Sequence, residues 1–127
     1  MSWDQLFARA EALALEMPED EQIELIDAHP RLGSPPASVS ALSFTEQGYD
    51  RETTEAIEEL GLLNDAYEAR FGFRYCVFVA GRSRVALVPE MRDRLSADRA
   101  SVNRRALQDV IAIARDRQRT RAAGAPA

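Results

Sequence analysis

The sequence contains no lysine, one cysteine and one histidine among its 127 residues, and all 16 of its basic residues are arginines. Without lysine, the chain cannot form a lysine Schiff base, the usual pyridoxal phosphate linkage or a phosphate-binding P-loop. With only Cys76 and His29, one chain can form neither an internal disulfide nor a cysteine–histidine zinc cluster. A serine–histidine–aspartate site is open only through His29.

Long hydrophobic runs and an excess of positive charge are also missing. No apolar run reaches the ~18–20 residues of a membrane span, and the first residues do not form a basic and then apolar signal sequence. The formal net charge of −5 disfavours broad binding to nucleic acids or anionic membranes. We therefore expect a cytoplasmic protein with no nucleic-acid or membrane partner.

The composition is that of a globular protein. Apolar residues make up 46% of the chain and charged residues 29%, which excludes extended disorder. A chain of this length can bury a core without disulfides. We predict one domain over residues 1–121, followed by a frayed tail of small residues over 122–127.

Helical patterns dominate the chain. A capping box formed by Ser2 and Gln5 opens the first predicted helix, which ends at Met17 before Pro18. Pro18 is expected in the first turn of a second helix, which His29 and the proline after it bring to an end. Three more helices are predicted over about 54–70, 83–95 and 98–119, and a short one begins at the capping box of residues 43–46.

Three features qualify this pattern. Gly72 is placed to end the 54–70 helix, and Pro89 predicts a kink or a late start in the 83–95 helix. Residues 71–80 read locally as a buried strand, although a buried helix would have a similar pattern. A lone strand would have no partner, so the prediction is an all-α, single-domain multi-helix bundle.

His29 has the strongest claim to chemistry, because imidazole is the one side chain that ordinarily changes charge near neutral pH. It follows a predicted helix and precedes Pro30, which places it at the start of a loop, where functional groups often lie. A histidine at a helix end can equally serve only to interact with the helix dipole. The residue alone leaves both interpretations open.

Other candidates also have structural explanations. Ser43 and Glu46 fit a capping box, which needs no function to explain it, whereas Gln47 is not required by that box. Cys76 lies in an apolar run and is expected to be a buried, unreactive thiol. Arg117 continues by one turn the apolar stripe of the last helix, formed by Val102, Ala106, Val110 and Ile113. It either extends into solvent or points into a pocket, where it would hold a carboxylate.

Six short motifs, taken in order, resemble the OHCU decarboxylase family (2-oxo-4-hydroxy-4-carboxy-5-ureidoimidazoline decarboxylase). They are His29-Pro30-Arg31-Leu32-Gly33, Ser43-Phe44-Thr45-Glu46-Gln47, Leu63-Asn64-Asp65-Ala66-Tyr67, Arg70-Phe71-Gly72-Phe73, Arg94-Leu95 and Ile113-Ala114-Arg115-Asp116-Arg117. The resemblance extends from about Trp3 to Arg119. It implies an all-α protein, usually a homodimer, that uses no cofactor and decarboxylates OHCU to (S)-allantoin during urate degradation.

The resemblance also implies the site residues. His29 corresponds to the catalytic histidine, acting as general acid and base, and Glu46 steers its proton. The implied substrate-binding residues are Pro30, Ser43, Gln47, Phe73, Tyr75, Cys76, Val77 and Arg117. No metal ligand is implied.

The sequence departs from the family pattern in places. Arg31 stands where many members carry aspartate, Arg74 and Tyr75 stand where Pro-Phe is common, and Ala100 and Val102 replace frequent acidic residues. Arg31 and Arg74 keep open a related enzyme that acts on a different ureido or imidazolone acid. A non-catalytic helical interaction domain is the other alternative, in which the capping box and the helix-end His29 are purely structural.

Overall fold

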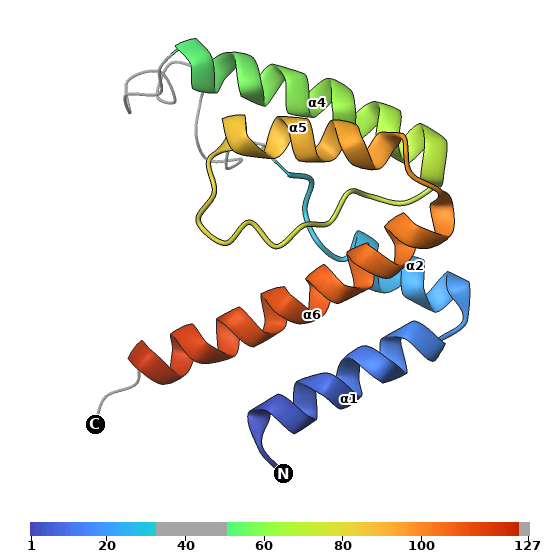
Figure 1. The fold of residues 1–127 in the computed structure, drawn as a ribbon, viewed down its shortest axis with the longest axis vertical. Helices are drawn as coiled ribbons and strands as arrows, with labels where there is room; N and C mark the ends of the chain where they lie inside the picture. Colours follow the sequence, from blue (N-terminus) through green and yellow to red (C-terminus); the bar gives the residue numbers. More distant parts are fainter. Residues whose placement is uncertain (33–50, 125–127) are drawn as a thin grey trace. The chain divides into compact units, whose positions relative to one another are not determined.

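The computed structural model describes residues 1–32 and 51–124, and every regular element within these ranges is an α-helix (Figure 1). The helices are α1 (Trp3–Glu16), α2 (Glu19–Asp27), α4 (Arg51–Phe71), α5 (Arg84–Leu95) and α6 (Arg99–Gly124). The predicted all-α fold is confirmed. None of these helices has the length and apolar character needed to span a membrane. The helix predicted after Ser43 lies outside the described residues.

The start of α1 and the boundary with α2 follow local signals in the sequence. The predicted capping box is present: Gln5 donates its backbone N–H to Ser2 Oγ at 3.1 Å, and Ser2 donates to Gln5 Oε1 at 2.9 Å. The first helix is capped at Met17, as predicted. Pro18, however, is the N-cap of α2 and not a residue of its first turn, because its carbonyl accepts from Gln22 at 3.0 Å while its own backbone stays extended.

Helices α4 and α5 also differ in detail from the prediction. α4 begins three residues early, at Arg51, and ends as predicted because Gly72 adopts a φ of +81°. α5 begins at Arg84, where Ser83 Oγ accepts from the backbone N–H of Ala86 at 3.1 Å. Its start is therefore not delayed, and Pro89 lies inside the helix.

The last helix is longer than predicted. α6 continues to Gly124 and does not end near Arg119, because no glycine or proline interrupts it before that point. At its other end Asp98 accepts hydrogen bonds from Ser101, from the backbone N–H at 3.0 Å and from the hydroxyl at 2.7 Å. These two hydrogen bonds lower the pKa of the Asp98 carboxyl.

The ambiguous stretch between α4 and α5 is neither strand nor helix. After Gly72 the chain is irregular, and at its far end Ala80 and Gly81 have φ values of +53° and +76°. The side chains within it are nevertheless buried, with Tyr75 1% exposed and Cys76 4% exposed. The apolar pattern therefore predicted correctly that these side chains are buried, but it did not predict their irregular backbone.

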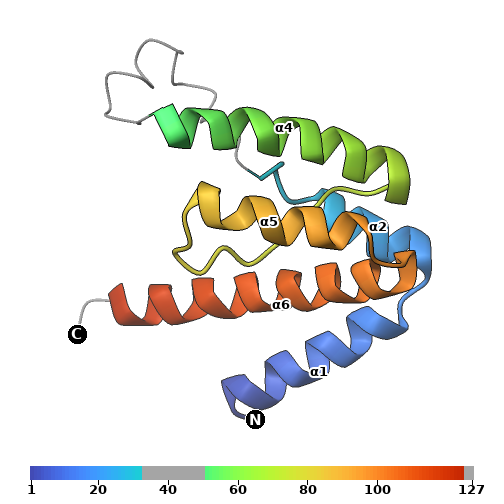
Figure 2. The ribbon, with the colours of Figure 1, turned by 45° about the horizontal axis from the view of Figure 1, so that its top comes forward.

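The described chain forms two compact units. In one unit, α1 and α2 pack on α6, and α1 lies alongside α6 in both views (Figures 1 and 2). Its buried side chains include Ala14, Ile26, Val102, Ala106, Leu107 and Val110. In the other unit, α4 and α5 lie side by side (Figure 2). Its buried side chains include Leu60, Tyr67, Phe71, Phe73, Leu87 and Met91.

Candidate functional site

His29 lies directly after the end of α2, as its position before Pro30 predicts. Its backbone N–H donates to the carbonyl of Ile26 at 3.1 Å, and its imidazole Nδ1 lies 3.2 Å from the carbonyl oxygen of Leu25. A carbonyl can only accept, so this contact requires the proton on Nδ1 and, in the neutral ring, leaves the lone pair on Nε2. The half-buried ring is therefore oriented by its contact with the end of α2.

The two residues after Pro30 are attached to α4. Arg31 Nε donates to Glu68 Oε2 at 2.8 Å, and Arg31 Nη2 pairs with both Glu68 and Asp65. These bonds to Asp65 and Glu68 raise the pKa of the Arg31 guanidinium above its usual value. The backbone carbonyl of Leu32 accepts from Asn64 Nδ2 at 2.9 Å. Arg31, one of the departures from the family pattern, therefore has its guanidinium engaged by protein carboxylates.

Arg117 lies in a groove formed by the end of α6 and the start of α1. The apolar stripe of α6 is buried at Val102 and Val110. Arg117, which continues this stripe toward the end of the helix, is exposed. The groove measures about 520 Å³, and its described lining consists of Trp3, Ala114, Arg117, Gln118, Arg121 and Ala122. A guanidinium beside an aromatic ring and an amide is a donor set suited to a planar anion. His29 is not among these lining residues.

The neighbouring arginine of the same motif has a different environment. Arg115 is only one-third exposed and pairs with Asp4 of α1. Within the Ile113–Arg117 motif, Arg115 therefore joins α6 to α1, and Arg117 lines the groove.

The predicted pocket residues of the 73–77 segment have buried side chains. Phe73 and Tyr75 pack edge-on against Tyr67, with ring centroids 5.8 and 5.1 Å away. The guanidinium of Arg94 covers the Tyr75 ring at 5.3 Å. These aromatic side chains therefore serve packing.

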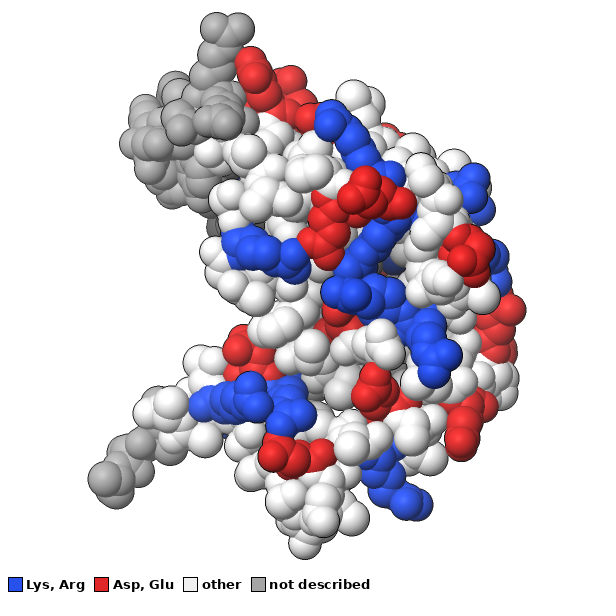
Figure 3. Space-filling view, viewed as in Figure 1, with Lys and Arg blue, Asp and Glu red and all other residues white. Residues whose placement is uncertain are grey.

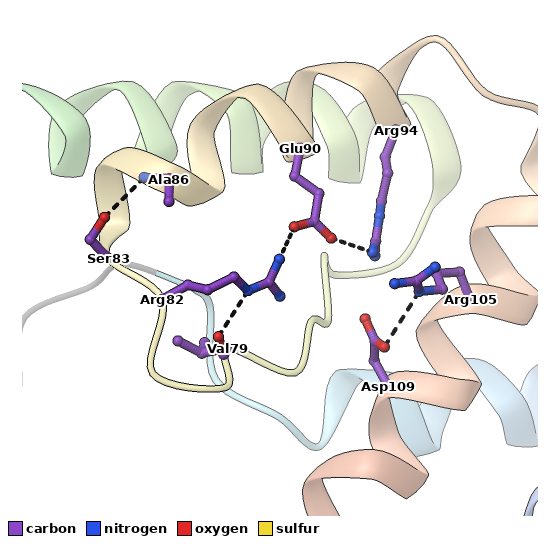
Figure 4. Close-up of polar contacts among 8 residues, drawn as sticks. All are labelled: Val79, Arg82, Ser83, Ala86, Glu90, Arg94, Arg105 and Asp109. Atoms are coloured by element: carbon purple, nitrogen blue, oxygen red, sulfur yellow. Dashed lines mark hydrogen bonds and ion pairs between the residues drawn. The ribbon is translucent and has the colours of Figure 1, made fainter.

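An arginine–glutamate network, which the sequence analysis did not anticipate, supports this segment. Glu90 of α5 accepts from Arg94 at 2.6 Å and also pairs with Arg82, which donates through Nε to the carbonyl of Val79 at 2.9 Å (Figure 4). The only sequence signal was the Arg94-Leu95 motif. Over the face drawn in Figure 3, arginine and acidic side chains are interspersed, in keeping with such pairing.

The remaining predicted site residues, Ser43, Glu46 and Gln47, lie outside the described residues. Whether they approach His29 is therefore a prediction only. Within residues 1–32 and 51–124, no group of three carboxylate, imidazole or thiol side chains is arranged to hold a metal ion.

Comparisons with known proteins identify the family. The model of the OHCU decarboxylase family matches residues 1–119. The uric acid degradation bifunctional protein PucL of Bacillus subtilis is 33% identical over 77% of this chain, which covers 20% of that protein. The 2-oxo-4-hydroxy-4-carboxy-5-ureidoimidazoline decarboxylase of Halalkalicoccus jeotgali is 33% identical over 76% of this chain, which covers 56% of that protein.

A solved structure shares the fold. It is a crystal structure of OHCU decarboxylase in the presence of (S)-allantoin, superposed with a TM-score of 0.74 over 94% of this chain and 81% of that one, at 18% identity. The chain spans a fifth to about half of the length of the relatives it matches. The family match over residues 1–119 nevertheless covers nearly the whole chain, and the chain therefore belongs to the OHCU decarboxylase family.

Proposed function

We propose that this protein catalyses the cofactor-independent decarboxylation of OHCU to (S)-allantoin in urate degradation. The observation that carries the proposal is the family match over residues 1–119. It is supported by relatives whose names assign them to uric acid degradation or to this decarboxylation. The oriented imidazole of His29 and the arginine-lined groove supply groups that the reaction requires.

The substrate can act as its own electron acceptor. The bond between ring carbon 4 and its carboxylate breaks, CO2 leaves, and the electron pair passes into the adjacent imine, whose nitrogen takes a proton. The 4-hydroxyl then loses its proton as carbon 5 gains one, which creates the carbonyl and the stereocentre of allantoin. The protein must orient the carboxylate and deliver a proton to one face.

We assign these tasks to the predicted site residues. His29 is the general acid and base that delivers the proton, and Glu46 steers that proton by hydrogen bonding. Arg117, Gln47 and Ser43 hold polar groups of the substrate, while Pro30 and the backbone of residues 73–77 line the pocket. Support for His29 comes from the contact between its Nδ1 and the carbonyl oxygen of Leu25, which orients the imidazole ring.

A different substrate preference has less support. Arg31 was one reason to consider another ureido or imidazolone acid, but its guanidinium is held by Asp65 and Glu68. A side chain engaged in this way contributes little to recognising a different acid. OHCU is therefore the favoured substrate.

The test is circular dichroism of a coupled reaction. Urate oxidase and hydroxyisourate hydrolase generate OHCU in situ, and this protein is then added as wild type or as His29→Ala. We expect rapid, optically active (S)-allantoin from the wild type, and a loss of at least about 10²-fold in rate for His29→Ala, because general acid–base catalysis supplies ~10²–10⁴-fold.

Other outcomes have clear meanings. Slow racemic allantoin in both samples would contradict the proposed reaction and favour a non-catalytic domain. Near-normal turnover by His29→Ala would remove only its role as acid and base. A folded His29→Ala variant, checked by its helical far-ultraviolet spectrum, is the required control.

We also propose a homodimer in the cytoplasm. Its support is an exposed apolar face on α1, where Leu6 and Leu13 are 43% and 52% exposed. These two residues are seven positions apart, which is about two helical turns, and so lie on the same side of α1. A second copy of the chain is the partner that would cover this face.

A further inference from the structure

We propose that Arg31 and Asn64 are positioning residues for His29, because together they fix to α4 the backbone that leaves His29. The inference rests on the proposed function for its catalytic consequence, although the attachment itself can be tested without any activity.

The first attachment is a forked ion pair. The guanidinium of Arg31 reaches two carboxylates one turn apart on the same helix, donating through Nε to Glu68 at 2.8 Å and pairing through Nη2 with Asp65. A planar guanidinium held at two points has a defined direction, which a single-point ammonium would lack. This pair therefore fixes a side chain two residues after His29 with respect to α4.

The second attachment is a partly buried hydrogen bond. Asn64 is 2% exposed, and its Nδ2 donates to the backbone carbonyl of Leu32 at 2.9 Å. Its Oδ1 is buried and accepts no hydrogen bond from the part of the chain that the structure describes. A buried amide N–H left without an acceptor is costly, so the bond to the Leu32 carbonyl favours keeping Leu32 against Asn64.

Covalent geometry carries the restraint back to His29. Consecutive Cα atoms are ~3.8 Å apart, so the Cα of His29 lies within about 7.6 Å of that of Arg31. The intervening residue is Pro30, whose ring fixes its φ angle and removes one source of freedom. On its other side His29 follows α2 and contacts the carbonyl of Leu25. His29 therefore directly follows a helix end, and the anchored segment begins two residues after it.

The geometry of a catalytic group has a large effect on rate. A displacement of ~1 Å caused by a distant substitution can cost ~10²-fold. Loosening the segment after His29 should therefore lower kcat, while substrate contacts made elsewhere keep KM nearly unchanged. This split distinguishes positioning from a general loss of stability.

The experiment compares Arg31→Gln with Arg92→Gln in the full chain. Arg92 of α5 forms a comparable exposed ion pair with Glu59 of α4, but it has no connection to the segment after His29. We expect Arg31→Gln to lower kcat about tenfold or more with KM changed less than about twofold, and Arg92→Gln to leave both unchanged. Arg31→Lys, which keeps the charge but not the fork, should fall between wild type and Arg31→Gln.

A second readout needs no substrate. Because His29 is the only histidine, the imidazole hydrogens in the proton NMR spectrum of the tag-free protein come from one residue. At fixed pH we expect Arg31→Gln to shift or double these signals and Arg92→Gln to leave them in place. Asp65→Asn combined with Glu68→Gln removes the same attachment from the other side and should reproduce the effect.

The outcomes separate this inference from the proposed function. A wild type that does not decarboxylate OHCU contradicts the proposed function, and the imidazole signals alone then decide the attachment. An active wild type with normal kcat in Arg31→Gln overturns the positioning role. Imidazole signals that are identical in wild type and Arg31→Gln overturn the attachment itself.

Discussion

At the scale of single residues, partners distinguish arginines that look alike in the sequence. Arg115 and Arg117 are two positions apart in one motif, yet Arg115 pairs with Asp4 and Arg117 lines the groove beside Trp3. Helical spacing separates their directions by about 200°. The motif therefore contains one residue that stabilises the packing of α6 on α1 and one that is available to a ligand.

This difference gives a matched pair of variants. We expect Arg117→Ala to raise KM for OHCU roughly ten- to a hundredfold with the fold intact, because a hydrogen bond to a charged group contributes ~1.5–3 kcal/mol. Arg115→Ala should leave KM unchanged and lower thermal stability slightly, because partly exposed ion pairs contribute little. Steady-state kinetics and thermal melts of both variants provide the measurement, and an unchanged KM in Arg117→Ala would indicate a solvent-exposed arginine with no substrate contact.

At the scale of elements, helix ends follow local chemistry and the linking segment follows packing. Ser2 and Ser83 begin α1 and α5 as N-caps, and Gly72 ends α4 in the left-handed conformation. Residues 73–77 contain no capping residue or glycine that would specify their backbone conformation locally. Their aromatic side chains are held by Tyr67 from α4 and by Arg94 from α5, so their irregular path depends on those two helices.

The two glycines of this region test the role of helix ends. Gly61 lies inside α4, Gly72 lies at its end with a φ of +81°, and a Cβ atom added at either meets no atom within 4 Å. Backbone conformation alone should therefore decide the effect. We expect Gly61→Ala to raise the free energy of unfolding by about 0.5–1 kcal/mol and Gly72→Ala to lower it by about 1–2 kcal/mol. Urea titrations measure both, and a stabilising Gly72→Ala would mean that α4 does not end there.

At the scale of the whole molecule, the open question is what covers the exposed face of α1. Leu6 and Leu13 lie on that face, and other residues of α1, among them the buried Ala14, pack on α6. Side chains of this size are enriched in interfaces between subunits and are unfavourable when left in water.

The homodimer makes a direct prediction. Light scattering should give the wild type twice the 14.2 kDa mass of one chain. The double variant Leu6→Glu with Leu13→Glu should be monomeric, because burying two carboxylates in an interface is unfavourable. Leu62→Glu, at a 71% exposed position on α4, is the control and should remain dimeric. A wild-type monomer at micromolar concentration would contradict the proposal.

The amino-acid sequence by itself determined the order of the described helices, the capping box at Ser2, the end of α4 at Gly72, the family and the position of His29 at a helix end. These features depend on neighbours within a few residues, through capping hydrogen bonds, proline and glycine dihedral angles and apolar periodicity. Tertiary structure alone decided that Arg31 and Asn64 attach the segment after His29 to α4, and that Tyr75 packs under Arg94. These contacts join residues about 20 to 40 positions apart, and local patterns carry no information about which distant side chains will meet.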